Sequence, residues 1–235
     1  MSSGRQPRPS RAVTARLVGI TIALLACTVA ACWAVVALAG SFPGDRKVAA
    51  EIAKENLGTV GLAPAHALDF LGRPPVALTV VALLALVVAR RLGWRHAALV
   101  IAGLGASAIT TLLKHLVDRQ RPPGGIELDP SFPSGHTAWA TAVFGLIFVL
   151  AIRRRHYWPA AAAALIVAAM GPSRLLLGVH YFSDVLAGYA IGLAWLLALT
   201  LIGLPWAAAS HKRRQRHVAN TQTTPSGEDR HAASR

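Results

Sequence analysis

The chain is divided into long hydrophobic runs joined by shorter polar connections. Six runs of 14 to 25 residues contain no Asp, Glu, Lys or Arg. Strands would alternate apolar and polar side chains with a period of two, whereas these runs are apolar on every helical face, as membrane-buried helices are. About 20 residues cross the hydrocarbon core of a bilayer, so flanking Arg and Trp residues must lie at the interface where a run is shorter. We therefore predict six transmembrane helices, at residues 17–39, 76–89, 97–113, 137–152, 157–173 and 185–209.

The composition favours a membrane protein over a soluble one. Of the 235 residues, 54% are hydrophobic and only 14% are charged, which is too little polar surface for a soluble globule of this size. The expected fold class is all-α: a polytopic membrane protein whose six transmembrane helices form one bundle. We place this membrane domain at residues 16–209. Residues 1–15 and 210–235 are polar without apolar periodicity, and we expect two disordered cytoplasmic tails there.

The basic residues indicate how the bundle is oriented. They gather on one side of the six-helix arrangement, at Arg5, Arg8, Arg11, Arg16, Arg90, Arg91, Arg95, Arg153, Arg154, Arg155, Lys212, Arg213, Arg214 and Arg216. The first, third and fifth connections carry acidic residues mixed with basic ones. Because Arg- and Lys-rich loops remain in the cytoplasm, we predict a multi-pass protein of the cell membrane. Both termini are then cytoplasmic, and the odd-numbered connections are extracytoplasmic.

The net charge of +14 does not indicate a nucleic-acid partner, since no basic stripe with interleaved aromatic residues occurs outside the short loops. The 20 Arg residues against 4 Lys, together with abundant Ala, suggest a bacterial source. The sequence TVAAC, ending at Cys32, resembles a lipoprotein cleavage site. The apolar run continues to residue 39, which favours a spanning helix, although processing at Cys32 stays open.

The first outer connection, residues 41–75, is longer than a turn requires. Its segments VAAEIAKENLG and APAHALDFLG have apolar spacing suited to short helices at the membrane interface. Such helices would cover a site at the outer rim, or would simply form a solvated connector. For His66 and Asp69 within this connection we favour solvated surface over contact with a lipid head group.

Three outer segments contain the unusual polar residues, at positions 114–123, 132–137 and 173–184. Lys114, Arg121 and Arg174 bring three positive charges next to an apolar environment, and Arg binds oxyanions through paired N–H donors. Ser134 has the position of a helix N-cap, and Gly135 lets the backbone approach a ligand closely. The free N–H groups at this helix start add a further anion site. The expected ligand is a phosphate.

Two histidines and a carboxylate extend binding to chemistry. Neutral histidine is a good phosphorus nucleophile, and a second histidine can protonate the leaving oxygen. We assign these roles to His180 and His136. Asp184 lies four residues after His180 and can accept a hydrogen bond from its ring. Because the three cations can offset the phosphoryl charge, no metal ion and no other cofactor is expected.

The motifs together carry a resemblance. Lys114 with Arg121 and Pro122 reads K-x6-RP, residues 133–136 read PSGH, and residues 173–184 read S-R-x5-H-x3-D. This order resembles the type-2 phosphatidic acid phosphatase superfamily, which also includes vanadium haloperoxidases and bacterial acid phosphatases. The resemblance to its membrane lipid phosphate phosphatases implies that His180 becomes phosphorylated, Asp184 orients it and His136 protonates the leaving group. It also implies that Lys114, Arg121, Ser134, Gly135 and Arg174 bind the phosphate.

The sequence therefore predicts a metal-independent hydrolase of lipid phosphates or diphosphates, with its active site at the extracytoplasmic rim and phosphorylated membrane lipids as its partners. Phosphatidate, phosphatidylglycerol phosphate and polyprenyl diphosphates are candidate substrates. A lipid phosphotransferase using the same His, His and Asp site is the alternative enzyme, and a non-catalytic lipid-binding or transport protein is the alternative outside enzymology. Oligomeric state stays open. We expect His115, Asp118 and Arg119, which adjoin the first motif without fitting its spacing, to be interfacial polar groups.

Overall fold

The computed structural model describes residues 42, 44–54, 58–123 and 129–205, with isolated positions 19, 23, 26, 30 and 34. In this part of the chain every regular element is a helix. The elements are α2 (Asp45–Lys54), α3 (Gly58–Gly72), α4 (Pro74–Leu92), α5 (Trp94–Ala102), α6 (Gly105–Val117), α7 (Gly135–Arg153), α8 (Tyr157–Leu176), α9 (Phe182–Ala198) and the π-helical turn η1 (Leu199–Gly203).

Five stretches of helix are long and apolar enough to cross a membrane. They are Pro74–Leu92, Trp94–Val117, Gly135–Arg153, Tyr157–Leu176 and Phe182–Leu201, and they confirm five of the six predicted spans. The short helices expected in the first outer connection are also present, as α2 and α3. The predicted first span, Cys32 within it and both predicted tails lie outside the described residues.

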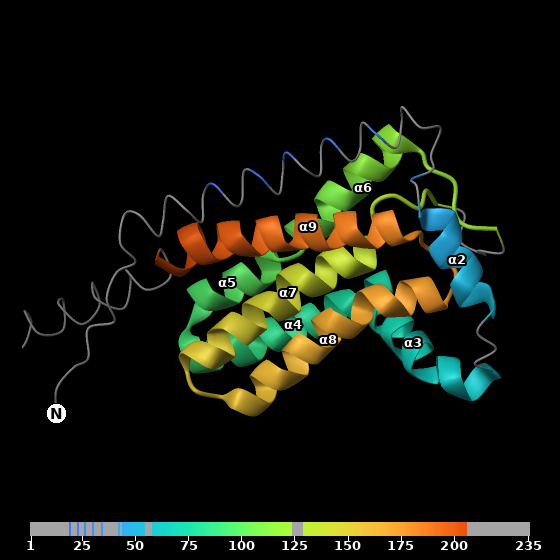
Figure 1. Cartoon of the computed structure of the whole chain (residues 1–235). Coiled ribbons are helices and arrows are strands. Elements are labelled where there is room, and N and C mark those ends of the chain that lie inside the picture. Colours follow the sequence, from blue (N-terminus) through green and yellow to red (C-terminus); the bar gives the residue numbers. More distant parts are fainter. Residues whose placement is uncertain are drawn as a thin grey trace, which may run out of the picture.

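Helix α7 forms the centre of the bundle. Figure 1 shows it between α9 and α8, and it is the most buried of the five spans. Glycines let α9 approach α7 closely: a Cβ on Gly188 would lie 2.6 Å from the carbonyl oxygen of Ser134, and one on Gly192 would lie 2.6 Å from that of Ala138. Small residues at such contacts are the usual means of packing membrane helices, since lipid supplies no hydrophobic drive between them.

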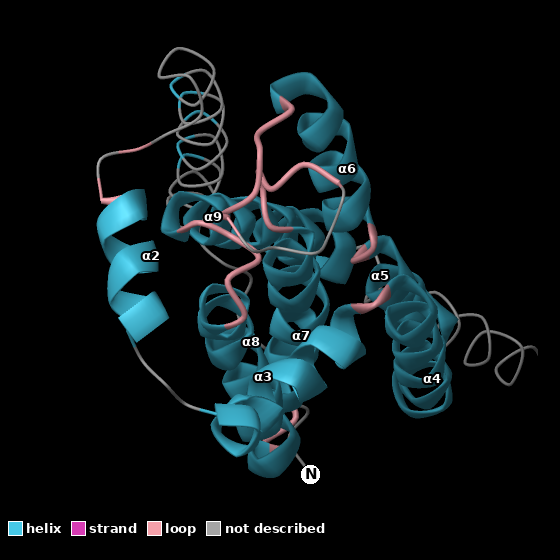
Figure 2. Cartoon of the chain, turned by 90° about the vertical axis from the view of Figure 1, so that its right-hand side faces the viewer, coloured by secondary structure: helices cyan, strands magenta, loops and turns pink. Residues whose placement is uncertain are grey.

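The outer connections predicted from the charge pattern meet at one end of the bundle. Figure 1 shows α2 and α3 together at this end, opposite the turn between α7 and α8. Figure 2 looks onto the same end, where the loop after α6 and the loop between α8 and α9 lie among the tips of α3, α6, α7 and α9. The three motif segments, which are far apart in the sequence, are thereby brought to one place.

Candidate active site

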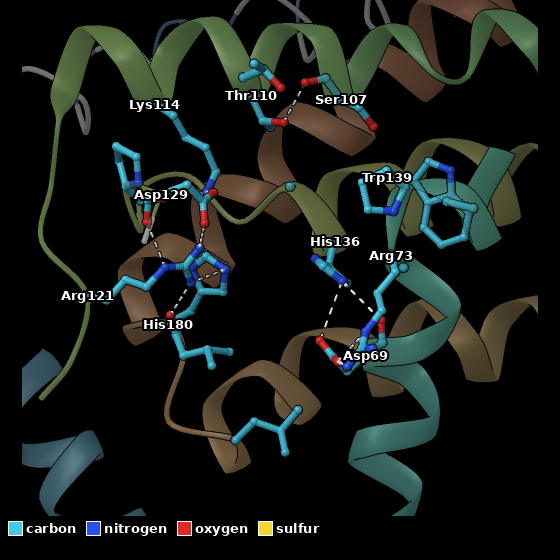
Figure 3. A pocket seen from close by; sticks show the side chains of 18 of the residues that line it. Asp69, Arg73, Ser107, Thr110, Lys114, Arg121, Asp129, His136, Trp139 and His180 are labelled. Carbon is cyan, nitrogen blue, oxygen red and sulfur yellow. Dashed lines mark hydrogen bonds and ion pairs between the residues drawn. The ribbon is translucent and has the colours of Figure 1, made fainter. Parts of the chain in front are cut away.

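A cavity of about 950 Å³ opens at this end of the bundle. Its walls come from α3, α4, α6, α7 and the loops before α7 and α9. Five of the eight predicted site residues line it: Lys114, Arg121, Gly135, His136 and His180. The other three, Ser134, Arg174 and Asp184, are fully buried directly behind its wall. Figure 3 shows the two histidines on opposite sides of the cavity.

Lys114 and Arg121 are held by one carboxylate. Lys114 lies in the last turn of α6, and its Nζ is 2.5 Å from Oδ2 of Asp129. Arg121 donates from Nη2 to Oδ1 of the same residue at 2.7 Å. Burial would raise the pKa of Asp129, but the two cations outweigh it and lower the pKa to about 2. Asp129 is therefore an ionised counter-ion at the place where we expect phosphate.

His180 is bonded at both ring nitrogens. Its Nδ1 lies 3.4 Å from Oδ2 of Asp184, and its Nε2 lies 3.4 Å from Nη1 of Arg121. A guanidinium can only donate and a carboxylate can only accept, so Nδ1 carries the proton and Nε2 presents its lone pair. Burial lowers the pKa of His180, and the nearby charges of Arg121 and Arg174 act in the same direction against Asp184. The arrangement favours a neutral imidazole whose unprotonated Nε2 faces Arg121.

His136 lies in the first turn of α7, next to α3. Its Nε2 is 3.3 Å from the backbone oxygen of Asp69 and 3.8 Å from the Oδ1 carboxylate oxygen of that residue. A Cβ on Gly72 would lie 2.0 Å from Cδ2 of His136, so only glycine allows α3 to lie this close to the ring. Helix α3 is thus part of the site wall.

Arg174 pairs with Asp69, the residue of α3 that we expected at a solvated surface. Arg174 is fully buried near the end of α8 and donates from Nη1 to Oδ1 of Asp69 at 2.5 Å. The side chain of Asp69 is only 14% exposed and also binds Arg73. Burial would raise the pKa of Asp69, but Arg174 and Arg73 lower it. The expectation was wrong because α3 folds against α7 and α8, a contact that no local pattern reveals.

Ser134 and Gly135 form the start of α7. Ser134 is the N-cap residue, as predicted, but its Oγ lies 3.0 Å from Oγ1 of Thr137 and its side chain is fully buried. Its backbone N–H donates to the backbone oxygen of Asp184 at 3.0 Å, which joins α7 to α9. Gly135 lines the cavity, and a Cβ there would lie 3.4 Å from Oγ1 of Thr110. The helix start with its free N–H groups therefore faces the cavity through Gly135.

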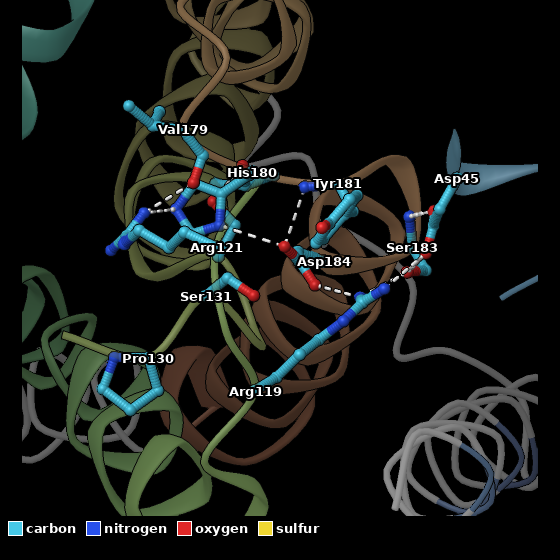
Figure 4. Close-up of polar contacts among 12 residues, drawn as sticks. Asp45, Arg119, Arg121, Pro130, Ser131, Val179, His180, Tyr181, Ser183 and Asp184 are labelled. Atoms are coloured by element: carbon cyan, nitrogen blue, oxygen red, sulfur yellow. Dashed lines mark hydrogen bonds and ion pairs between the residues drawn. The ribbon is translucent and has the colours of Figure 1, made fainter. Parts of the chain in front are cut away.

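Arg119 is not the interfacial group that its position suggested. It is 3% exposed, and its Nη1 donates to Oδ1 of Asp184 at 2.5 Å. Its Nη2 donates to Oδ2 of Asp45, at the start of α2, at 2.6 Å. Figure 4 shows these residues in a chain that leads from α2 to His180. Arg119 sits two residues before Arg121 in a polar loop, where the sequence gives no sign that it turns inward.

Three cations lie close to the two histidines of the site. Among the described residues no three His, Cys, Asp or Glu side chains are grouped so as to hold a metal ion. Lys114, Arg121 and Arg174 instead converge around the two histidines. This set of charges suits a ligand with several anionic oxygens.

Comparison with known proteins identifies the family. The PAP2 superfamily pattern matches residues 93–207. The decaprenylphosphoryl-5-phosphoribose phosphatase of Mycobacterium tuberculosis is 36% identical over 141 residues, which cover 56% of this chain and 74% of that protein. A lipid A 1-phosphatase of Rhizobium johnstonii is 34% identical over 122 residues, which cover 46% of this chain and 48% of that protein.

A solved structure shares the fold. The crystal structure of the transmembrane PAP2 type phosphatidylglycerolphosphate phosphatase from Bacillus subtilis superposes with a TM-score of 0.65, covering 79% of this chain and 95% of that chain at 22% identity. The chain therefore belongs to the PAP2 superfamily and is a multi-pass membrane phosphatase.

Proposed function

We propose that this phosphatase removes the terminal phosphate of a phosphorylated membrane lipid through a phosphohistidine formed on His180. One observation carries the proposal: His180 lines the cavity with an unprotonated Nε2 beside Arg121, while Asp184 holds Nδ1 behind the wall. Lys114 and Arg121 lie at the same wall. A nucleophile, its orienting carboxylate and a cationic phosphate site thus occur together.

In the first step, Nε2 of His180 attacks phosphorus and the bond from phosphorus to the lipid oxygen breaks. His136 gives its proton to that oxygen, so the lipid leaves as an alcohol. Asp184 accepts the Nδ1–H bond and stabilises the positive charge that grows on the ring. In the second step, water attacks phosphorus, its proton passes to His136, and the bond between nitrogen and phosphorus breaks. The products are the lipid alcohol and inorganic phosphate.

Lys114, Arg121 and Arg174 would stabilise the negative charge of the transferring phosphoryl group. The start of α7 at Ser134 and Gly135 adds backbone N–H donors to this phosphate site. In the structure, Asp129 forms ion pairs with Lys114 and Arg121. Asp69 forms an ion pair with Arg174. Substrate phosphate therefore displaces these two carboxylates from the cations. The same carboxylates neutralise the cations when no substrate is bound.

The deeper part of the cavity suits a lipid. Below the rim, its wall contains apolar residues of α4, of the segment joining α5 to α6, and of α7: Ala77, Leu78, Leu104 and Trp139. Leu78, on a helix long and apolar enough to cross a membrane, is 55% exposed. An acyl or prenyl chain entering between α4 and α6 would keep its hydrocarbon in the bilayer, and its phosphate would reach the rim. We place this rim on the extracytoplasmic side, following the basic loops at the other end.

The names of the similar phosphatases suggest which substrates to test first. The M. tuberculosis relative, whose length this chain covers to 74%, is named for decaprenylphosphoryl-5-phosphoribose, and the other relatives are named for lipid A 1-phosphate and phosphatidylglycerophosphate. We propose a lipid whose phosphate is carried on a sugar or glycerol head group, with the polyprenyl-linked phosphosugar as the first substrate to assay.

The test measures phosphate release by detergent-purified protein from four lipids: the polyprenyl-linked phosphosugar, phosphatidylglycerol phosphate, phosphatidate and a polyprenyl diphosphate. His180→Ala is expected to abolish release while the protein remains folded. Acid-labile label transferred from a ³²P-lipid to the wild-type protein, and absent from His180→Ala, would support the intermediate. Appreciable turnover by His180→Ala would refute the nucleophile, and a phosphorylated alcohol in place of free phosphate would make the protein a transferase.

A further inference from the structure

The structure assigns Asp45 and Arg119 to the catalytic unit: we propose that they position Asp184, and through it His180, by a buried chain of charge-assisted hydrogen bonds from α2. The inference rests on the proposed role of His180 in turnover. Neither residue belongs to the three motifs, and neither contacts the cavity. Both are positioning residues, because they act on the phosphate only through Asp184.

The contacts form a continuous path. Arg119 uses Nη1 to bind Oδ1 of Asp184 at 2.5 Å and Oγ of Ser183 at 2.8 Å, and it uses Nη2 to bind Oδ2 of Asp45 at 2.6 Å. Asp45 also accepts from Ser183, from the backbone N–H at 2.9 Å and from Oγ at 2.6 Å. The ring of Tyr181 lies 4.3 Å from Cζ of Arg119 and covers one face of the guanidinium.

This path fixes the direction of the Asp184 carboxylate. Its Oδ2 accepts from the backbone N–H of Tyr181 at 2.8 Å and faces Nδ1 of His180 at 3.4 Å. A carboxylate bonded through Oδ2 alone could still tilt about that oxygen. Arg119 removes this freedom by holding Oδ1, so that Oδ2 stays aimed at the histidine.

Burial makes the unit rigid. The side chains of Arg119, Asp45 and Asp184 are 1%, 2% and 0% exposed. Buried charges are tolerated only when they are paired and hydrogen-bonded, and removing one partner leaves the others without compensation. Asp45 therefore neutralises Arg119 at Nη2, the nitrogen that does not bind Asp184.

Helix α2 is anchored at the same place by apolar contacts. Phe42, three residues before Asp45, packs against Phe132 and Ala187, which are buried beside the start of α7 and within α9. The backbone N–H of Asp45 donates to the backbone oxygen of Phe42 at 3.2 Å, which joins the two anchors. The beginning of the first outer connection is thus a structural part of the active site rather than a connector.

The charges of Asp45 and Arg119 should also affect the pKa of His180. The groups that face this ring are Asp184 on α9, Arg121 in the loop after α6, Arg174 on α8 and His136 on α7. Adding or removing a charge behind Asp184 changes the stability of the imidazolium. Loss of the negative Asp45 should lower the pKa of His180, whereas loss of the positive Arg119 should raise it. If Asp45 and Arg119 only stabilised the fold, their replacement would not shift the pKa of His180 in opposite directions.

The experiment compares Asp45→Asn and Arg119→Gln with Glu51→Gln in the full-length protein. Glu51 lies on the same helix and is exposed, with its carboxylate bonded to Lys54, so this variant is a matched control for loss of a carboxylate from α2. We expect kcat to fall about 10- to 100-fold in Asp45→Asn and Arg119→Gln, as for other residues that orient a catalytic ligand. KM should change less than about threefold, and Glu51→Gln should behave as wild type.

Two readouts separate positioning from general stability. The acid limb of kcat/KM should move down in pH for Asp45→Asn and up for Arg119→Gln, each by up to about one pH unit. In ¹⁵N-histidine-labelled protein, the His180 signals, assigned by their absence from His180→Ala, should titrate with the same two shifts. The isosteric Asp45→Asn keeps the test valid if Arg119→Gln fails to fold.

Failure of the proposed function and failure of this inference would give different results. Turnover by His180→Ala would refute the nucleophile, whereas the NMR titration would still report whether Asp45 and Arg119 act on His180. An unchanged titration and acid limb in Asp45→Asn would overturn the inference. It would also be overturned if Arg119→Gln lowered kcat as much in an Asp184→Asn background as in wild type, because a residue acting through Asp184 loses its effect there.

Discussion

Asp129 pairs with two of the cations that we propose bind phosphate, so its replacement should strengthen phosphate binding. Its carboxylate binds Nζ of Lys114 at 2.5 Å and Nη2 of Arg121 at 2.7 Å. Substrate or inorganic phosphate must displace these contacts before it can use the same donors. Asp129→Asn keeps the size of the side chain and removes the competing charge. We expect a lower inhibition constant for inorganic phosphate and a lower KM, with kcat little changed.

The expected gain in phosphate affinity follows from the strength of the ion pairs between Asp129 and the two cations. Burial opposes ionisation of Asp129, yet Lys114 and Arg121 bring its pKa from 3.8 to about 2. This shift corresponds to roughly 2 kcal/mol of net stabilisation of the ionised form. The side chain of Asp129 is 56% exposed and solvent screens such pairs, so the two ion pairs contribute about 1 kcal/mol. Removing it should tighten phosphate binding about fivefold.

The assay is competitive inhibition by inorganic phosphate during lipid dephosphorylation. Because the pKa of Asp129 is about 2, its carboxylate is ionised throughout the assay range, and the gain should be equal at pH 5.5 and pH 7.5. Asp118→Asn, an exposed carboxylate at the end of α6, serves as the control and should leave the inhibition constant unchanged. An equal or higher inhibition constant in Asp129→Asn would show that the carboxylate supports the phosphate site and does not compete with phosphate.

Four further predictions concern the two histidines and their surroundings. Burial, Arg121 and Arg174 lower the pKa of His180 against Asp184, so the acid limb of kcat/KM should lie below pH 6.5; a limb above that value would contradict a neutral nucleophile. Arg174→Ala should reduce kcat/KM by about 100- to 1,000-fold, of the order of a lost preorganised donor, and a near-neutral effect would limit Arg174 to an anchoring role. Gly72→Ala should lower kcat at least about tenfold, because its Cβ would overlap the ring of His136, and a calorimetric scan should show whether the unfolding temperature also falls. Turnover should persist in excess EDTA, since the site cations supply the positive charge, and loss of activity restored by Mg²⁺ would refute this.

The helices were predictable because the bilayer imposes a simple rule. A run of apolar residues without charges must satisfy its backbone internally, and five of the predicted spans are described as helices. The break between α5 and α6 at Gly103 and Leu104 was not predicted. There a Cβ on Gly103 would lie 2.8 Å from the side chain of Val143, and one on Gly105 would lie 2.3 Å from Trp195. These contacts come from the tertiary packing of the span, which periodicity cannot reveal.

The gathering of the motif residues at one end of the bundle was predictable for a different reason. Cations, histidines and a carboxylate at helix ends are costly near a membrane, so their presence at fixed spacing indicates a common site. Asp69, Asp129, Asp45 and Arg119 carry no such signal. Each lies in a polar connection where an acidic or basic residue is ordinary, and each enters the site only because the connection folds back onto the bundle.

Charge balance nevertheless distinguishes two kinds of carboxylate among these missed residues. A site that receives a multiply charged anion must be strongly cationic, yet unpaired cations beside a low-dielectric membrane are expensive, so an empty site needs counter-ions. A counter-ion that yields to substrate must be accessible, as Asp129 is, whereas one that holds the nucleophile in place must stay dry, as Asp45 is at 2% exposure. On the proposed function, Asp129 is thus the carboxylate that phosphate displaces, and Asp45 is the one that remains in place through the catalytic cycle. The opposite effects expected of Asp129→Asn on phosphate affinity and Asp45→Asn on kcat follow directly from that difference.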